Sequence, residues 1–265
     1  MSLQVVVNFR VIDESDDWIV VDKPAPLIVH PANNQPEPTL LGGLEQLLSF
    51  ELANGASLGI VTRLDRETSG IVLIAKHTAA ARELGWVFER RQARKEYLAI
   101  VKGWPDADAW ECSYPLARAA DVGKSEIWVR QMPHFQGRAC KTSFQVERRF
   151  ERAEGKFALV RCFPETGRMH QIRVHLAATG FPILGDKIYS GNGSEYLEWL
   201  EDGWTKELES RLLLSRHALH AARLQVPSPK GWIQWDAGLP DDMQSFLDGR
   251  KVEPTPDIVI WSRHD

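Results

Sequence analysis

The stretch from Val61 to Gly70 reads Val-Thr-Arg-Leu-Asp-Arg-Glu-Thr-Ser-Gly. Strand-like apolar runs flank it at residues 58–61 and 71–75, so we expect a loop that joins two strands. Asp65 stands in this loop between Arg63 and Arg66. Nearby positive charge favours the ionised form of a carboxyl group. The sequence therefore predicts an ionised carboxylate on a loop, where it is available as a nucleophile or a base.

The rest of the chain alternates short apolar runs, turn signals and segments with helical spacing. We expect strands at residues 9–13, 18–22, 97–101, 139–150, 157–163 and 218–226, and helices from residue 39 onward and at 78–91, 168–179 and 195–214. Residues 104–137 lack clear periodicity and read as hairpins or an inserted loop. This order predicts an α+β fold with a mostly antiparallel central sheet and flanking helices and loops. We expect a single catalytic domain over residues 1–265, with its core at about 9–230.

The charge of the chain is unevenly distributed. Residues 61–175 hold 21 Lys and Arg against 14 Asp and Glu, whereas the remaining residues hold 11 against 22, so the centre is basic and the flanks are acidic. A basic face can neutralise phosphates even when the net charge is −4, because phosphate contacts are local. The pattern favours a nucleic-acid partner, and a solvated surface of uneven charge is the alternative.

Composition argues against several other classes of protein. The sequence contains no run of 18 apolar residues, so we expect no membrane span. The first residues lack a basic region followed by a long apolar stretch, so we expect no signal peptide. Cys112, Cys140 and Cys162 are odd in number and widely spaced, which argues against a disulfide framework and a zinc site and favours the reducing cytoplasm. His170 and His175 are five residues apart, which does not fit the i, i+4 spacing of a helical zinc site. We expect no metal.

The stretch at 61–70 resembles the Arg-Leu-Asp-Arg-x-Thr-Ser-Gly signature of the RluA-type pseudouridine synthases, which isomerise uridine within RNA. Five further segments resemble the family in the same order: Lys23-Pro24 with Val29-His30-Pro31, Lys95-Glu96-Tyr97, residues 165–175, residues 185–189 and Leu219-His220-Ala221. The resemblance implies the pseudouridine synthase catalytic fold. The chain departs from the family at Thr62, where the family usually has histidine.

The resemblance assigns roles to individual residues. Asp65 matches the catalytic aspartate, Tyr97 the active-site tyrosine that stacks on the base, and Arg173 the cation that pairs with the aspartate. On a helix over 168–179, His170 and Arg173 would share a face. The residues expected to contact substrate are Arg63, Arg66, Thr68, Arg168, His170, Lys23 and His30. Without the resemblance, Tyr97 would read as a core residue and Asp65 as a structural ion-pair partner.

The function implied is that of an isomerase that converts specific uridines of ribosomal or transfer RNA to pseudouridine after flipping the base. The reaction needs no cofactor, and we expect RNA as the partner of a cytoplasmic monomer. Asp65 would attack C1′, attack C6 or remove the 2′ proton. The family-like pattern begins near Phe9, so we expect no separate N-terminal RNA-binding domain and look to residues 104–137 for target choice. Two alternatives are a catalytically inactive RNA-binding protein on the same scaffold and a glycoside hydrolase using Asp65 with Glu67.

Overall fold

The computed structural model describes residues 8–31 and 38–255, and the chain divides into two compact units. Of the described residues, the first unit contains 8–31, 38–93, 221–238 and 255. The second unit contains residues 94–220 and 239–254. Strand β11 (Leu219–Ser228) therefore begins in the second unit and continues in the first. The expectation of one catalytic domain stays a prediction.

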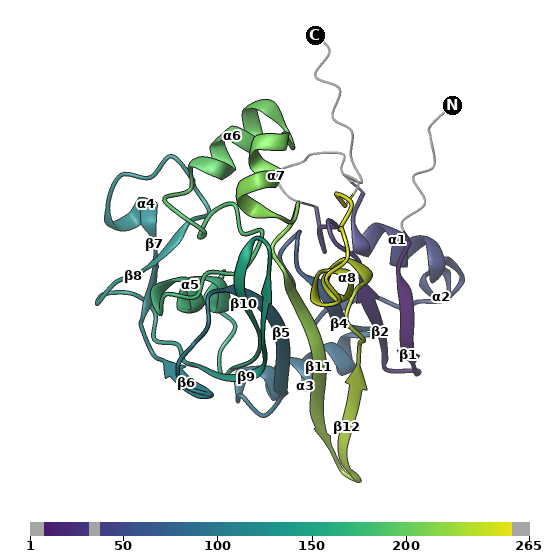
Figure 1. The fold of residues 1–265 in the computed structure, drawn as a ribbon. Helices are drawn as coiled ribbons and strands as arrows, with labels where there is room; N and C mark the ends of the chain where they lie inside the picture. Colours follow the sequence, from purple (N-terminus) through teal and green to yellow (C-terminus); the bar gives the residue numbers. More distant parts are fainter. Residues whose placement is uncertain (1–7, 32–37, 256–265) are drawn as a thin grey trace. The chain divides into compact units, whose positions relative to one another are not determined.

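The first unit is built on a sheet whose strand order is β1-β2-β4-β11-β12, with β3 paired to β4 (Figure 1). Its strands are β1 (Arg10–Glu14), β2 (Trp18–Lys23), β3 (Gly59–Ile60), β4 (Ser69–Ala75), β11 and β12 (Gly231–Asp236). Its helices are α1 (Leu40–Leu47), α2 (Ser49–Ala53) and α3 (Thr78–Glu89). β11 and β12 form a hairpin closed between Ser228 and Gly231.

Helices cover both faces of this sheet, which explains why Ile71–Ala75 is an uninterrupted apolar run. In β4, Ile71 and Leu73 pack with Ala80 and Leu84 of α3. Val72 and Ile74 alternate with them and pack instead with α1, in the cluster that contains Leu40 and Leu44. All seven residues of β4 are buried. The loop that carries Asp65 is thus attached to a strand fixed on both of its faces.

Gly70 allows the two central strands of this unit to approach closely. Its φ is 110°, and a Cβ atom at this position would lie 2.3 Å from the carbonyl oxygen of Ala221 in β11. A side chain is excluded both by the backbone conformation and by this contact. The glycine that ends the 61–70 stretch is therefore needed for the packing of β4 on β11.

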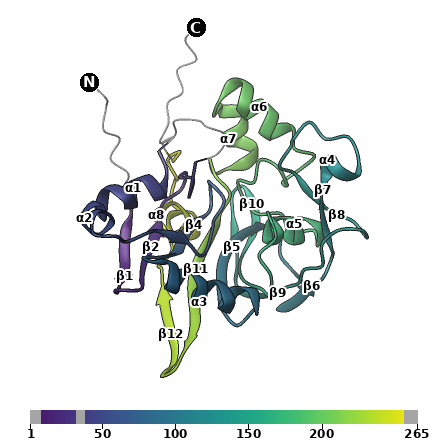
Figure 2. The ribbon, with the colours of Figure 1, turned by 180° about the vertical axis from the view of Figure 1, so that it is seen from behind.

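The second unit contains strands in the order β5-β10-β9-β6 and a separate antiparallel pair, β7-β8 (Figure 2). Its strands are β5 (Arg94–Lys102), β6 (Ala109–Cys112), β7 (Leu116–Arg118), β8 (Gln131–Pro133), β9 (Thr142–Arg152) and β10 (Gly155–Pro164). Its helices are α4 (Ala119–Val122), α5 (Gln171–Ala178), α6 (Ser194–Asp202), α7 (Lys206–Leu212) and α8 (Asp241–Leu247). The strands predicted at residues 139–150 and 157–163 are present as β9 and β10, which pair antiparallel.

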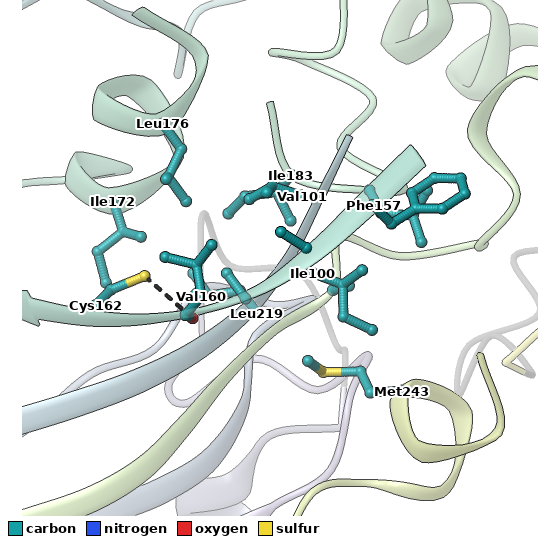
Figure 3. Packing of buried hydrophobic residues seen from close by; sticks show 14 of the residues in the cluster. Ile100, Val101, Phe157, Val160, Cys162, Ile172, Leu176, Ile183, Leu219 and Met243 are labelled. Carbon is teal, nitrogen blue, oxygen red and sulfur yellow. Dashed lines mark hydrogen bonds between the residues drawn. The ribbon is translucent and has the colours of Figure 1, made fainter. Parts of the chain in front are cut away.

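The core of the second unit forms between its sheet, α5 and α8. Figure 3 shows Ile100 of β5 and Val160 of β10 between Leu176 of α5 and Met243 of α8. Met243 is completely buried. Helix α8 thus contributes to the core of the second unit, and the expected limit of the catalytic core at about residue 230 stays a prediction.

The acidic segment expected as one helix over 195–214 is two helices, α6 and α7, and the expectation of a single helix is wrong. The first helix ends at Gly203, whose φ is 72°, and Thr205 caps the second by accepting a hydrogen bond from the Leu208 amide at 3.2 Å. A glycine followed by a capping threonine ends one helix and starts the next. Within residues 8–31 and 38–255, no helix has the length and apolar character to cross a membrane.

Candidate functional site

The loop that carries Asp65 lies between β3 and β4 in the first unit. The carbonyl oxygen of Asp65 accepts a hydrogen bond from the Thr68 amide at 3.1 Å, so residues 65–68 form a turn. Asp65 and Arg66 are half-buried, Arg63 is exposed and Thr68 is buried. The Asp65 side chain therefore stands on a tight turn that leads directly into the buried strand β4.

Thr62 closes the start of this loop against β4. Its hydroxyl accepts a hydrogen bond from the Leu73 amide at 2.9 Å, and its own amide donates to the Leu73 carbonyl at 3.2 Å. A threonine side chain can take the place of a backbone partner in this way. The departure from the family pattern at this position thus has a structural role in the present chain.

Lys23 fixes the backbone on the other side of Asp65. It is completely buried, and its ammonium group donates to the carbonyl oxygens of Pro24, Leu27 and Arg66 at 2.9, 2.8 and 3.1 Å. Buried ammonium groups require such partners. Lys23 was expected to contact substrate, but this geometry gives it an indirect role, which is to hold the turn at Arg66. His30 is exposed, with Nδ1 3.0 Å from the carbonyl oxygen of its neighbour Pro31.

Tyr97 lies in β5 of the second unit, opposite Cys162 of β10. It is half-buried and packs against the core of this unit. Lys95, two residues earlier in the same strand, donates from Nζ to the carbonyl oxygen of Thr166 at 3.0 Å. Burial lowers the pKa of Lys95 to about 8. This lysine connects the tyrosine strand to the segment that precedes α5.

The segment before α5 is held by the side chain of Gln171. Its Oε1 accepts from the Thr166 hydroxyl at 2.5 Å and from the Arg168 amide at 3.1 Å, and its Nε2 donates to the Lys141 carbonyl at 3.0 Å. Gln171 is 3% exposed. The conformation of residues 166–170 is therefore set by a buried amide, while the side chain of Arg168 remains exposed.

His170 lies outside the helix, so the expectation that it shares a helical face with Arg173 is wrong. Helix α5 begins at Gln171, and His170 has a left-handed backbone with a φ of 54°. Its Nδ1 lies 2.8 Å from the hydroxyl oxygen of Tyr189. His170 is therefore oriented by the Tyr189 hydroxyl rather than by the helix.

Arg173 is buried in α5 and forms a two-point ion pair with Asp186. Its Nε and Nη2 donate to the two carboxylate oxygens of Asp186 at 2.7 and 2.9 Å. The guanidinium carbon also lies 5.1 Å from the centre of the Tyr189 ring. A bidentate pair fixes the plane of the guanidinium as well as its position. Arg173 is thus held rigidly within the second unit.

Asp186 is a residue whose role sequence reasoning missed, although the segment at 185–189 resembled the family. It is completely buried and also accepts hydrogen bonds from the amides of Ile188 and Tyr189 at 3.0 and 3.1 Å. Burial by itself would raise the pKa of Asp186, but the charge and hydrogen bonds of Arg173 hold the pKa below its usual value. The carboxylate is therefore ionised opposite the guanidinium.

Each unit thus supplies different chemical groups. The first presents a carboxylate on a pinned turn with two neighbouring arginines, and the second presents a half-buried phenol and a rigid guanidinium. Among the residues that the structure describes, no cluster of three or more His, Cys, Asp or Glu side chains is arranged to hold a metal ion. The groups available suit acid–base or nucleophilic chemistry.

Comparisons with known proteins agree on one family. Residues 17–178, more than half of the chain, match the family model described as RNA pseudouridylate synthase. The ribosomal large subunit pseudouridine synthase D of Nitrosomonas europaea is 32% identical over 244 residues, which cover 91% of this chain and 65% of that protein. An uncharacterized RNA pseudouridine synthase of Aquifex aeolicus is 36% identical over 190 residues, which cover 71% of this chain and 58% of that protein.

A solved structure titled human RNA pseudouridylate synthase domain containing 4 matches with a TM-score of 0.71 and 24% identity. The match covers 94% of this chain and 95% of that one. At this identity the likeness concerns the fold alone, and it confirms the predicted α+β class with a mostly antiparallel sheet. The chain spans 58 to 65% of the length of the two curated relatives from Nitrosomonas and Aquifex.

Proposed function

Because the chain belongs to the RNA pseudouridylate synthase family, we propose that it converts uridine to pseudouridine within RNA. The match of residues 17–178 to the family model confirms the family membership that the resemblance of residues 61–70 predicted. The observation that carries the proposal is that Asp65 stands on a turn fixed by Lys23 and Thr62, inside the region that matches the family model. The curated relatives named ribosomal large subunit pseudouridine synthase D support ribosomal RNA as the target. Transfer RNA is the second target class that we predict.

The chemistry of the proposed reaction is an intramolecular rearrangement. The N1–C1′ bond of uridine breaks, the uracil turns, and a C5–C1′ bond forms, while the C5 proton is lost and N1 gains one. No net oxidation or group transfer takes place, so the protein needs no cofactor on chemical grounds. The target base must first leave its stack, which costs a few kcal/mol and favours loops and easily opened helices.

Three residues carry the chemistry in this proposal. Asp65 acts on the nucleotide by attacking C1′, attacking C6 or removing the 2′ proton, and all three routes require an ionised carboxylate. Tyr97 stacks on the uracil and takes part in proton transfer. Arg173 orients the Asp65 carboxylate, a role for which a guanidinium that is itself held in one plane is well suited.

A second group of residues contacts the RNA. Arg63 and Arg168 are exposed cations that suit contacts with phosphates, and Arg66 lies beside the catalytic carboxylate in sequence. Thr68, His170 and His30 complete the proposed contacts, whereas Lys23 acts through the turn that it holds. We further propose that the protein acts as a monomer in the cytoplasm.

The test is tritium release from RNA labelled at C5 of uridine, using ribosomal and transfer RNA transcripts. We expect release with the wild-type protein, none with Asp65→Asn, and RNA affinity of that variant within a few-fold of wild type. Glu67→Gln, which changes the other acid of the same turn, is the matched control and should retain turnover. Release by Asp65→Asn would refute the catalytic assignment. RNA binding by the wild type without any release would identify the inactive RNA-binding alternative instead.

A further inference from the structure

The second unit exposes a group of large apolar side chains around β7 and β8. We call this group the β7–β8 surface; it consists of Tyr114, Trp128, Met132, Phe135 and Met169, which are 51, 66, 38, 83 and 56% exposed. Single exposed apolar residues are common, but a connected group of them marks an interaction site. These residues come from the segment in which sequence reasoning placed target choice, apart from Met169.

Specific contacts connect two of these side chains, Trp128 and Met169. Arg118 of β7 lies opposite Gln131 of β8, and its guanidinium carbon is 4.0 Å from the centre of the Trp128 ring. Gln131 in turn donates from Nε2 to the sulfur of Met169 at 3.5 Å. Trp128 and Met169 therefore belong to one continuous surface. Arg118 also holds the exposed indole in place.

The β7–β8 surface adjoins residues that the proposed function places at the RNA. The Gln131 amide donates to the Tyr189 hydroxyl at 2.8 Å, and the same hydroxyl oxygen lies 2.8 Å from Nδ1 of His170. Met169 precedes His170 directly and follows Arg168. A strand of RNA held at Arg168 and His170 would thus continue onto this surface, so the inference rests on the proposed function.

The charges of this region suit a polyanion. Residues 113–138 contain four basic residues (Lys and Arg) and two acidic residues (Asp and Glu). The segment of α6 and α7, residues 194–212, contains two basic and six acidic residues. Lys124 and Arg138 are exposed, and neither forms an ion pair with any residue that the structure describes. Arg118 forms an ion pair with Asp121 at 2.5 Å, so its charge is already neutralised. Its contact on this surface is with the Trp128 ring. Excess positive charge beside exposed aromatic rings is the composition of a single-strand nucleic-acid surface.

We propose that the β7–β8 surface binds an unpaired stretch of the substrate RNA next to the target uridine. Trp128 and Phe135 stack on unpaired bases, and Lys124 and Arg138 contact the phosphates between them. Stacking on an aromatic ring accepts every base, so the surface selects unpaired RNA rather than a sequence. The substrate class is therefore a uridine flanked by single-stranded nucleotides, not a uridine within a continuous duplex.

The test measures binding and turnover separately. Fluorescence anisotropy with a labelled oligouridine of about 12 nucleotides is compared with the same strand paired to oligoadenosine. Trp128→Ala and Phe135→Ala should each weaken binding of the single strand by roughly 5- to 150-fold. Phe50→Ala is the matched control, because Phe50 is 78% exposed but lies in α2 of the first unit. It should bind as wild type does.

The salt dependence of RNA affinity tests the role of Lys124 and Arg138 independently. Lys124→Gln and Arg138→Gln should each reduce the slope of log affinity against log salt concentration by about 0.7 for a single strand. Equal binding of single strand and duplex by the wild type, or wild-type affinity in Trp128→Ala and Phe135→Ala, would overturn the inference.

Tritium release from ribosomal RNA distinguishes this inference from the proposed function. Release by the wild-type protein together with unchanged affinity in the aromatic variants would overturn the inference alone. Absence of release together with weakened binding in those variants would overturn the proposed function and support the surface as an RNA site.

Discussion

Replacing Asp186 by asparagine tests the rigid support of Arg173. In the wild-type protein Oδ1 accepts from Nη2 of Arg173 and from the amides of Ile188 and Tyr189, and Oδ2 accepts from Nε of Arg173 at 2.7 Å. An asparagine keeps the first oxygen but turns an NH2 group toward Nε. It also removes the negative charge that Asp186 places opposite a guanidinium that is 5% exposed. Removing one partner of a buried ion pair costs about 3–5 kcal/mol.

The assay is chemical or thermal unfolding of the purified variant. A loss of this size lowers Tm by roughly 6–20 °C in a protein of this length. Asp248→Asn is the control, because Asp248 pairs with Arg250 at the surface, where such pairs contribute less than about 1 kcal/mol. If Asp186→Asn were no less stable than Asp248→Asn, the reasoning about the buried pair would be refuted.

The same variant has a pH signature. The pKa of Asp186 is lowered in the folded protein, so its contribution to stability is present above the unfolded-state pKa of about 3.9 and is lost as the pH falls through the folded-state pKa. The stability gap between wild type and Asp186→Asn should therefore narrow at acidic pH. A gap that stays constant down to the lowest pH at which the wild type remains folded would contradict this account. If Arg173 also orients Asp65 as proposed, kcat should fall while RNA affinity is kept.

Three further outcomes follow from the loop and the strand that support the site. Gly70→Ala should lower stability by more than about 3 kcal/mol or prevent folding, whereas Gly55→Ala, which has a positive φ but open space around it, should cost less; both are measured by urea unfolding. Thr62→Val leaves the buried amide of Leu73 without its acceptor and should cost about 1–2 kcal/mol in the same measurement, and an unchanged midpoint would exclude this role of the hydroxyl. Because the pKa of Lys95 falls from 10.5 to about 8 on folding, the unfolded chain binds a proton that the folded chain lacks in this pH window. Wild-type stability should thus rise with pH relative to Lys95→Met, and parallel curves would contradict the burial of the ammonium group.

Much of the fold could be predicted because its signals are local. Residues 71–75 are apolar without interruption because both faces of β4 are covered, and the helix predicted at 78–91 is α3 at Thr78–Glu89. The break between α6 and α7 also had a local signal, since Gly203 is followed by the capping residue Thr205. The length of the acidic segment concealed it. Helix α8 was missed because it is short, although Met243 and Phe246 are almost completely buried.

The supports of the site could not be predicted because they depend on contacts distant in sequence. A histidine with positive φ has no signature in the chain, and His170 adopts it where the Gln171 side chain pins the preceding residues. The pairing of Arg173 with Asp186 joins residues 13 positions apart through a loop. Nothing in the order of residues indicates that Lys23 turns inward to three carbonyl oxygens rather than outward to a phosphate. The residue types were visible, but their partners required the fold.

The most direct measurement is a map of pseudouridine in ribosomal and transfer RNA from cells that lack this protein, compared with cells in which it is restored. Our account predicts that one or a few uridines lose the modification, that the wild-type protein restores it, and that Asp65→Asn does not although it accumulates to the same level. An unchanged map in the cells that lack the protein, or restoration by Asp65→Asn, would contradict the account.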